Sequence, residues 1–143
     1  MKAFKESIGT TSTPRVFKLE PSTFKEFADC VHATVGNTSF APLSSVAVPT
    51  IFTRFREGEF ELLERMGIAL PQVLHAEQTY EMLEILHPAE EVSFKTSLAS
   101  VFEKKGKGSN MAFLVFETEF IRTLDSQTIA RAKSTMVYRE GVS

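Results

Sequence analysis

Hydrophobic and polar residues alternate along the second half of the chain. From Val92 to Phe102 the even positions carry mainly apolar or small side chains, and polar residues stand between them. Two further strands are predicted over 111–122, which is apolar on both faces as far as Phe116, and over 128–139, with turn-like residues at 106–110 and 124–127. A period of two predicts antiparallel strands joined by short turns. A further strand is predicted from Leu74 onward, and the even positions 92–102 are expected to share one face.

The first half has the spacing of helices instead. Pro21-Ser22-Thr23 is a helix start, and apolar residues follow at i, i+3, i+4 and i+7 as Phe24, Phe27, Ala28 and Val31. A second helix is predicted over 50–66, ended by Gly67 and broken or kinked near Gly58. Residues 15–20 are predicted to be a short strand, and residues 1–14 a flexible or loosely attached N-terminus, or a strand added late.

Helices followed by a meander of about four long strands indicate one α+β domain over residues 15–143, with a helix packed on a sheet. The last predicted strand places Ala130, Ala132 and Ser134 on one face. Such small side chains allow a helix to lie close above the sheet.

Composition narrows the possible functions. The chain has 143 residues, 43% of them hydrophobic, which suits one globular domain. Sixteen basic and eighteen acidic residues give a net charge of −2, which argues against a general nucleic-acid binder. No run approaches the roughly 18 apolar residues of a membrane span. Residues 1–13 lack the apolar centre of a signal peptide. The single cysteine, Cys30, fits a reducing compartment, so we expect a cytoplasmic protein.

Several short segments, in order, carry a family resemblance. They are Val48–Phe52, Leu74–Tyr80 with His87–Val92, Val101–Gly108, Phe116–Glu119 and Ala130–Thr135. Together they resemble the MaoC-like hydratase/dehydratase superfamily, and more specifically its N-terminal-half, FAS1-like dehydratase domains. The resemblance implies the hotdog fold, in which an antiparallel sheet wraps around a central helix.

The resemblance also implies a chemistry. Members of the superfamily act on acyl thioesters of coenzyme A or acyl carrier protein, and active members carry an Asp and a His before the central helix. The matching stretch here, Val35–Pro42, contains neither residue. We therefore expect an accessory, substrate-binding subunit of a (3R)-hydroxyacyl-thioester dehydratase/enoyl hydratase. Its partner would be a catalytic hotdog subunit or a second copy. Two alternatives are a self-sufficient homodimeric acyl-thioesterase and a non-enzymatic acyl-thioester binding module.

On that hypothesis, candidate site residues follow. Thirteen phenylalanines supply either an apolar slot or simply the core, and Ile51, Phe52 and Phe55 are expected to line an acyl channel. The lysines at 104, 105 and 107 (Lys104, Lys105, Lys107) form either a solvated turn or a contact for coenzyme A phosphates or an acidic carrier protein. No separate cofactor and no metal are expected, since coenzyme A or phosphopantetheine is part of the substrate.

His75 and Glu77 are weak catalytic candidates. Alternation along a strand would place both on one face, where a carboxylate keeps an imidazole basic and oriented. A structural or interface role is the favoured interpretation of the pair. His32, His87 and Cys30 are expected to play no part in catalysis.

Overall fold

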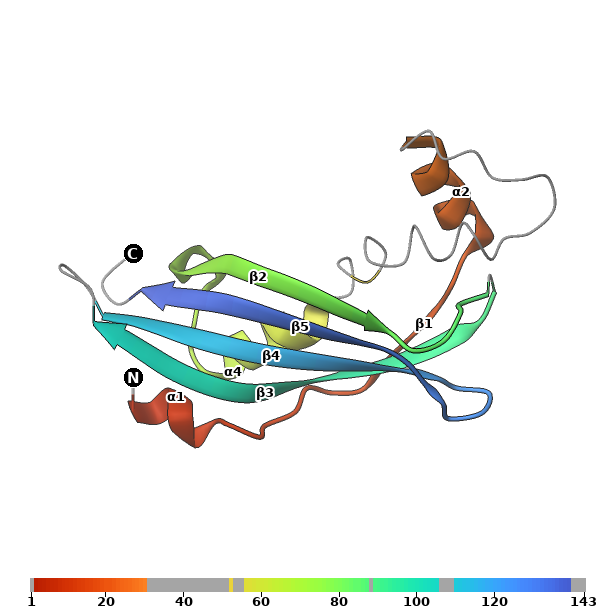
Figure 1. The fold of residues 1–143 in the computed structure, drawn as a ribbon. Coiled ribbons are helices and arrows are strands. Elements are labelled where there is room, and N and C mark those ends of the chain that lie inside the picture. The colour runs from red at the N-terminus through yellow and green to blue at the C-terminus, as the bar shows by residue number, and fades with distance from the viewer. Residues whose placement is uncertain (1, 31–51, 53–55, 88, 106–109, 140–143) are drawn as a thin grey trace.

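The computed structural model describes residues 2–30, 52, 56–87, 89–105 and 110–139 (Figure 1). Two of the expected channel residues, Ile51 and Phe55, lie outside these residues, as do Lys107 and the stretch 35–42. The described elements, in chain order, are α1 (Lys2–Glu6), β1 (Arg15–Lys18), α2 (Pro21–Cys30), α4 (Glu57–Arg65), a 3₁₀ turn η1 (Leu70–Gln72), β2 (Val73–Met82), β3 (Glu91–Lys105), β4 (Asn110–Arg122) and β5 (Thr128–Arg139).

One antiparallel sheet organises the molecule, with strand order β1-β3-β4-β5-β2. The consecutive strands β3, β4 and β5 form the predicted meander, and β5 begins and ends at the predicted residues. The helix α4 lies across one side of this sheet, and α2 stands beyond its far end (Figure 1). The α+β architecture predicted from the sequence is therefore confirmed.

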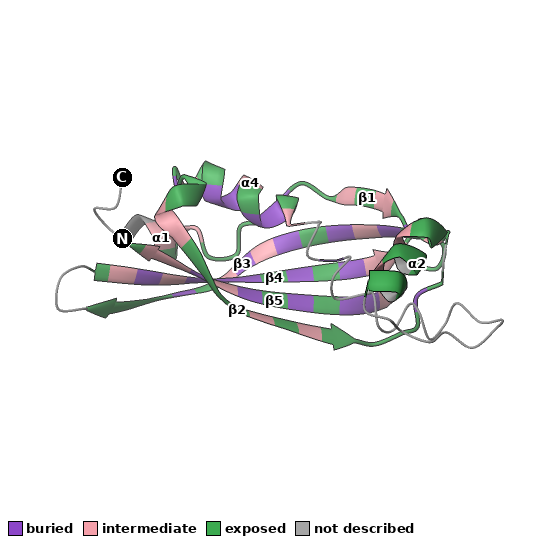
Figure 2. Cartoon of the chain, turned by 90° about the horizontal axis from the view of Figure 1, so that it is seen from above, coloured by how far each residue is buried: buried purple, intermediate pink, exposed green. Residues whose placement is uncertain are grey.

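The two faces of the sheet differ in burial. The inner face, which α4 covers, carries the buried residues of β3, β4 and β5, and the outer face carries the more exposed residues between them (Figure 2). The inner face divides into two apolar clusters. One is centred on Phe94, Phe120 and Ile129, and the other packs Leu62 and Leu63 of α4 against Leu98, Leu114, Phe116 and Met136 of the sheet. Each cluster removes large side chains from water, which is the main driving force for this packing.

Two irregularities in strand pairing overturn the simple alternation predicted above. The pairing of β3 with β4 shifts by one residue between Leu98 and Ser100. Beyond this shift Val101 is buried and Phe102 is 43% exposed, so Ser100 and Phe102 do not share the face of Leu98. A bulge inserts one residue into a strand and reverses the side on which every later side chain projects. The second irregularity lies in β2, between His75 and Glu77.

Gly58 explains how closely α4 approaches the sheet. The helical stretch predicted over 50–66 is broken near Gly58, as expected, because Arg56 lies in a turn and α4 begins at Glu57. Gly58 itself is buried in the first turn of α4. A Cβ atom at this position would lie 2.5 Å from the Thr96 hydroxyl oxygen of β3, closer than any real Cβ contact. The small residues expected to admit a helix behave as predicted, since Ala130, Ala132 and Ser134 are all buried on the inner face.

The N-terminal segment has defined partners along the edge of the sheet. Backbone hydrogen bonds join Gly9 and Thr10 to Leu98, and Ser12 to Thr96, so residues 9–12 extend the edge beside β3. Thr13 donates two hydrogen bonds to the Glu61 carboxylate of α4. The segment expected to be flexible or loosely attached thus acquires partners on both layers of the fold. Among the described helices, none is long and apolar enough to cross a membrane.

Candidate functional site

A small cavity lies between the N-terminal turn of α4 and the inner face of the sheet. Its volume is about 10 Å³, which is room for about one water molecule. The lining residues come from α4, β2, β4 and β5 and from two residues that precede α4: Phe52, Arg56, Glu59, Gln78, Tyr80, Thr118, Phe120 and Ala132. One side of the cavity is therefore aromatic and the other carries charged and polar groups.

Glu59 is the central charged group of this cavity. Its side chain belongs to a residue only 4% exposed, yet both carboxylate oxygens have partners. The Ser134 hydroxyl donates to one oxygen at 2.5 Å, and the Arg56 Nε–H donates to the other at 2.7 Å. A buried carboxylate needs such partners, because an unpaired charge is costly to remove from water. The contacts also fasten α4 to β5.

Tyr80 and Gln78 form the polar wall contributed by β2. Burial raises the pKa of the Tyr80 phenol; the nearby Arg56 charge opposes this rise and the Glu59 charge adds to it. The phenol therefore remains a neutral donor over a wide pH range. The Gln78 side chain donates to the Lys133 backbone oxygen at 3.2 Å, which fixes its orientation.

The aromatic wall is closely packed. Phe52 is 3% exposed, and its ring stacks on Phe120 with 3.9 Å between ring centroids. Phe17 packs edge-on against Phe52 at 6.3 Å and against Phe94 at 5.8 Å. Phe52 thus lies at the predicted position facing the sheet, ahead of α4, but in this structure it fills the space beside the cavity.

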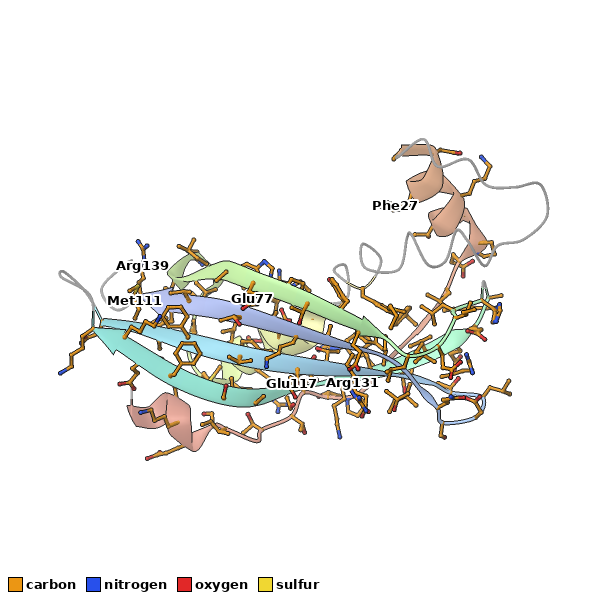
Figure 3. The ribbon with its side chains drawn as sticks, in the orientation of Figure 1. Phe27, Glu77, Met111, Glu117, Arg131 and Arg139 are labelled. Carbon is orange, nitrogen blue, oxygen red and sulfur yellow. The ribbon has the colours of Figure 1, made fainter. Side chains whose placement is uncertain are left out.

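The predicted pair of His75 and Glu77 is separated by the bulge in β2. His75 is paired in register with Met136, whose side chain is buried on the inner face, whereas Glu77 is paired with Thr135. The His75 ring instead lies 3.2 Å from the side-chain oxygen of Gln78. Glu77 projects from the outer face, which Figure 3 shows toward the viewer. The expectation that these two side chains are neighbours on one face is therefore wrong.

The lysines of the β3–β4 hairpin also lie away from the cavity. Lys104 is on the outer face, with its ammonium group 5.3 Å from the ring centroid of Phe113. It is eight residues along β3 from Thr96, roughly 26 Å at about 3.3 Å per residue. Lys105 follows at the end of the same strand. The structure does not bring Lys104 or Lys105 together with Phe52.

The sequence interpretation missed Glu59 and its partners Arg56 and Ser134. A signal was present, because Glu59 follows Phe55 by four residues and precedes Leu62 by three, the spacing of the apolar stripe. A charged residue in such a stripe predicts a buried polar contact, and Ser134 is a polar residue among the small residues of β5. Among the described residues, no three His, Cys, Asp or Glu side chains gather as a metal site would require.

The arrangement combines a buried carboxylate, a guanidinium, a neutral phenol and an aromatic wall. Donors such as the Tyr80 phenol and the Arg56 guanidinium can polarise a carbonyl oxygen, and the aromatic wall can contact an alkyl group. General acid–base chemistry needs a group free to exchange a proton, whereas both oxygens of Glu59 accept hydrogen bonds.

Comparison with known proteins gives one family match. The family described as "FAS1-like, dehydratase domain region" matches residues 6–129. No curated protein matches significantly by sequence.

Solved structures with a similar fold are numerous. The HadBC (3R-hydroxyacyl-ACP dehydratase) complex from Mycobacterium tuberculosis superposes with a TM-score of 0.61 at 15% identity, covering 92% of this chain and 96% of that one. A MaoC-like dehydratase from Rhodospirillum rubrum gives 0.60 at 14% identity, with 95% of each chain covered. The ChsH1–ChsH2 complex from M. tuberculosis gives 0.60 at 12% identity, covering 99% and 92%. At these identities the likeness shows a shared fold, which is the predicted hotdog.

Proposed function

This chain belongs to the FAS1-like dehydratase domain family, and on that premise we propose that it is the accessory, substrate-binding subunit of a (3R)-hydroxyacyl-thioester dehydratase or enoyl hydratase. The observation that carries the proposal is the hydrogen bonding of the Glu59 carboxylate. Its two oxygens are held by Ser134 and Arg56, and no histidine lines the cavity among the described residues. The cavity thus offers contacts for a thioester without a free acid–base pair.

The acyl group, on this proposal, enters beside Phe52. The polar wall receives the thioester carbonyl through Arg56 and Tyr80, and the aromatic wall contacts the alkyl chain. Because the cavity holds only about one water, the Phe52 ring must turn away from Phe120 for a longer chain to enter.

The missing acid–base pair, we infer, comes from a partner hotdog subunit. HadBC and ChsH1–ChsH2 are complexes, and a chain of each has this fold, which supports a two-chain arrangement. The strand β2 is the edge at which such a partner would pair. It borders the sheet over ten residues and is hydrogen-bonded to β5 on one side only among the described strands. An unpaired edge is a template for a further strand.

Hydration assays test this proposal directly. We expect the purified chain to bind acyl-CoA but not to hydrate crotonyl-CoA or longer 2-enoyl thioesters, since general acid–base assistance contributes about 10²- to 10⁴-fold per group. Adding a hotdog subunit that carries the Asp/His segment should restore turnover. Hydration by the isolated chain that disappears in Glu59→Gln or His75→Ala would overturn the accessory role, with Glu64→Gln on the exposed side of α4 as the matched control.

A self-sufficient acyl-thioesterase is the second candidate, and the position of Glu59 favours it over a mechanism through Glu77. Glu59 is the carboxylate that lines the cavity, whereas Glu77 is on the opposite face of the sheet. Hydrolysis of acyl-CoA by the isolated chain, abolished in Glu59→Gln but unchanged in Glu77→Gln, would establish this activity. Binding without turnover, with or without a partner, would instead indicate a non-enzymatic binding module.

A further inference from the structure

Side chains stand in rows across the outer face of the sheet, because directly paired residues of antiparallel strands project on the same side. The pairing registers define two charged rows and one apolar row, each read from β3 through β4 and β5 to β2. The charged rows are Lys95–Glu119–Arg131–Glu81 and Ser97–Glu117–Lys133–Thr79, and the apolar row, two rows further along, is Phe102–Phe113–Val137–Leu74. Figure 3 looks onto this face, with Glu117 and Arg131 labelled.

The first charged row alternates in sign from one strand to the next. Consider a second copy placed with its outer face against this one and related to it by a two-fold axis that runs parallel to the strands, between β4 and β5. This rotation reverses the strand order in the second copy, so that β4 faces β5 and β3 faces β2. Lys95 of one copy then faces Glu81 of the other, and Glu119 faces Arg131. In the second charged row Glu117 faces Lys133 in the same way. Every charge in these rows meets an opposite charge.

The perpendicular orientation of the axis fails this test. An axis running across the strands would set β4 of one copy on β4 of the other, so that Glu117 and Glu119 would face each other. The same axis would oppose Lys133 and Arg131. Like charges brought together in an interface cost free energy and exclude wrong orientations.

The apolar row gives an independent reason to expect that another protein surface packs on this face. Phe102 is 43% exposed and Leu74 is 56% exposed, although both lie within strands. The rings of Phe102 and Phe113 stack with 4.7 Å between centroids, so the two aromatic side chains form one apolar group on this face. The same two-fold axis sets Phe102 against Leu74 and Phe113 against Val137. Apolar residues therefore meet apolar residues as well.

We propose that a second copy of this chain packs on the outer face about this two-fold axis, forming a sandwich of two aligned sheets. Twisted sheets that pack in this way cross at about 30° and lie about 10 Å apart. The charged rows line an open hollow of about 500 Å³, into which the long lysine and arginine side chains of the copy extend.

Ion pairs within the chain leave these charges available for the copy. Arg131 lies 3.6 Å from Glu81 and 3.9 Å from Glu119, and Lys133 lies 3.8 Å from Glu117. All five side chains are about half exposed. Each can therefore keep its neighbour in the chain and gain a partner across the interface. Cross-strand pairing alone would explain the opposite charges on adjacent strands, but it gives no reason for the exposed apolar row.

The proposed interface is separate from the edge of β2 and does not depend on the accessory role. A catalytic partner at the edge and a second copy on the face can bind at once. In that case two complexes, each formed at a β2 edge, would associate through their outer faces.

Two opposite charge reversals test the proposal. In the proposed dimer, position 117 of one copy faces position 133 of the other. Glu117→Lys therefore sets lysine against lysine, and Lys133→Glu sets glutamate against glutamate. We expect each variant alone to associate at least about tenfold more weakly than the natural chain in sedimentation velocity at low ionic strength. An equimolar mixture should regain the mass of the natural chain, because the lysine introduced in one variant then faces the glutamate introduced in the other.

Controls separate this result from altered folding or net charge. Glu64→Lys, on the exposed side of α4, makes the same charge change as Glu117→Lys and should leave the mass unchanged. Circular dichroism verifies that each variant is folded, and Leu74→Glu in the apolar row gives a second disruption if one charge reversal does not fold. The proposal is overturned if the natural chain and the variants have the same mass at every concentration, or if the mixture does not associate.

Discussion

Two adjacent residues of β5, Lys133 and Ser134, each contact a carboxylate, yet the two contacts differ in kind. The Ser134 hydroxyl donates to Glu59 at 2.5 Å on the inner face, where both residues are buried. The Lys133 ammonium lies 3.8 Å from Glu117 on the outer face, with both side chains more than half exposed. The outer pair joins two opposite charges, whereas the inner pair joins a neutral hydroxyl to a carboxylate. The inner contact should nevertheless contribute more to stability, because it is buried.

Water accounts for this difference. An exposed ion pair exchanges strong hydration for a screened attraction and gains little, about 0–1 kcal/mol. A buried carboxylate has already lost its hydration, so every remaining donor matters. The polar contacts of the inner face, which add to its apolar packing, are thus few and short. The outer face carries many long ones, which suit recognition better than stability.

Truncating an aromatic ring on each face should give the largest contrast. We expect Phe52→Ala to lower the free energy of unfolding by about 3–5 kcal/mol, because its ring is buried against Phe120. Phe102→Ala on the outer face should lose about 1 kcal/mol, the contribution of an exposed aromatic pair. Urea unfolding at one low protein concentration measures both.

Equal losses for the two rings would contradict the proposed contrast between the faces. A small loss for Phe52→Ala together with weaker binding of long-chain acyl-CoA would show that Phe52 lines an open channel. A large loss with unchanged affinity of the folded fraction would assign Phe52 to the core.

Substituting the neighbouring residues of β5 tests the polar contacts. Ser134→Ala removes the hydroxyl donor from a buried carboxylate and should cost about 1.5–3 kcal/mol. Lys133→Ala, one position earlier, should cost no more than about 1 kcal/mol, and added salt should abolish that loss. Chemical denaturation at low and high salt distinguishes the two. A salt-sensitive loss in Ser134→Ala would contradict a buried contact.

Gly58→Ala should destabilise the protein, although alanine favours helices. In an exposed helix this change gains up to about 1 kcal/mol, whereas here the new methyl group meets Thr96 and should cost about 1–3 kcal/mol. Thr96→Ala removes the closest atom, so the double variant should lose less than the two single losses combined. Thermal unfolding of the four proteins completes this cycle. A stabilised Gly58→Ala variant would mean that α4 lies farther from the sheet.

The smallest effect is expected at Glu61 of α4, whose side chain contacts the N-terminal segment. Hydrogen bonds from the Thr13 backbone and hydroxyl, with the charges of Arg65 and Arg15, lower the pKa of Glu61 below its ordinary value near 4.5. The folded state therefore binds this proton less readily than the unfolded chain, so the contribution is present above about pH 4.5 and is lost as the pH falls through the folded pKa.

Urea midpoints measured from pH 7 to pH 3 test this prediction. The natural chain should be more stable than Glu61→Gln at pH 7, and the two should converge as the pH falls through the folded pKa of Glu61, below its ordinary value near 4.5. A difference that persists unchanged into acid would show that hydrogen bonding alone, and not the charge of Glu61, holds the N-terminal segment.

Local patterns in the sequence were enough to predict the types of the main helices and strands after residue 14, the meander of β3, β4 and β5, and the small residues that admit a helix. The short helix α1 was not predicted. Periodicity and side-chain size encode these features, and each is set within a few residues. The family likeness rests on segments of the same kind, read in order along the chain.

Which side chains meet depends on tertiary packing instead. A one-residue shift at Ser100 and another between His75 and Glu77 redirected every side chain beyond them. Such bulges depend on how a strand fits its neighbour and the helix above it, and the alternating pattern does not reveal them. The cluster of Glu59 and Ser134 joins residues 75 positions apart, so its burial arose only when α4 packed on β5.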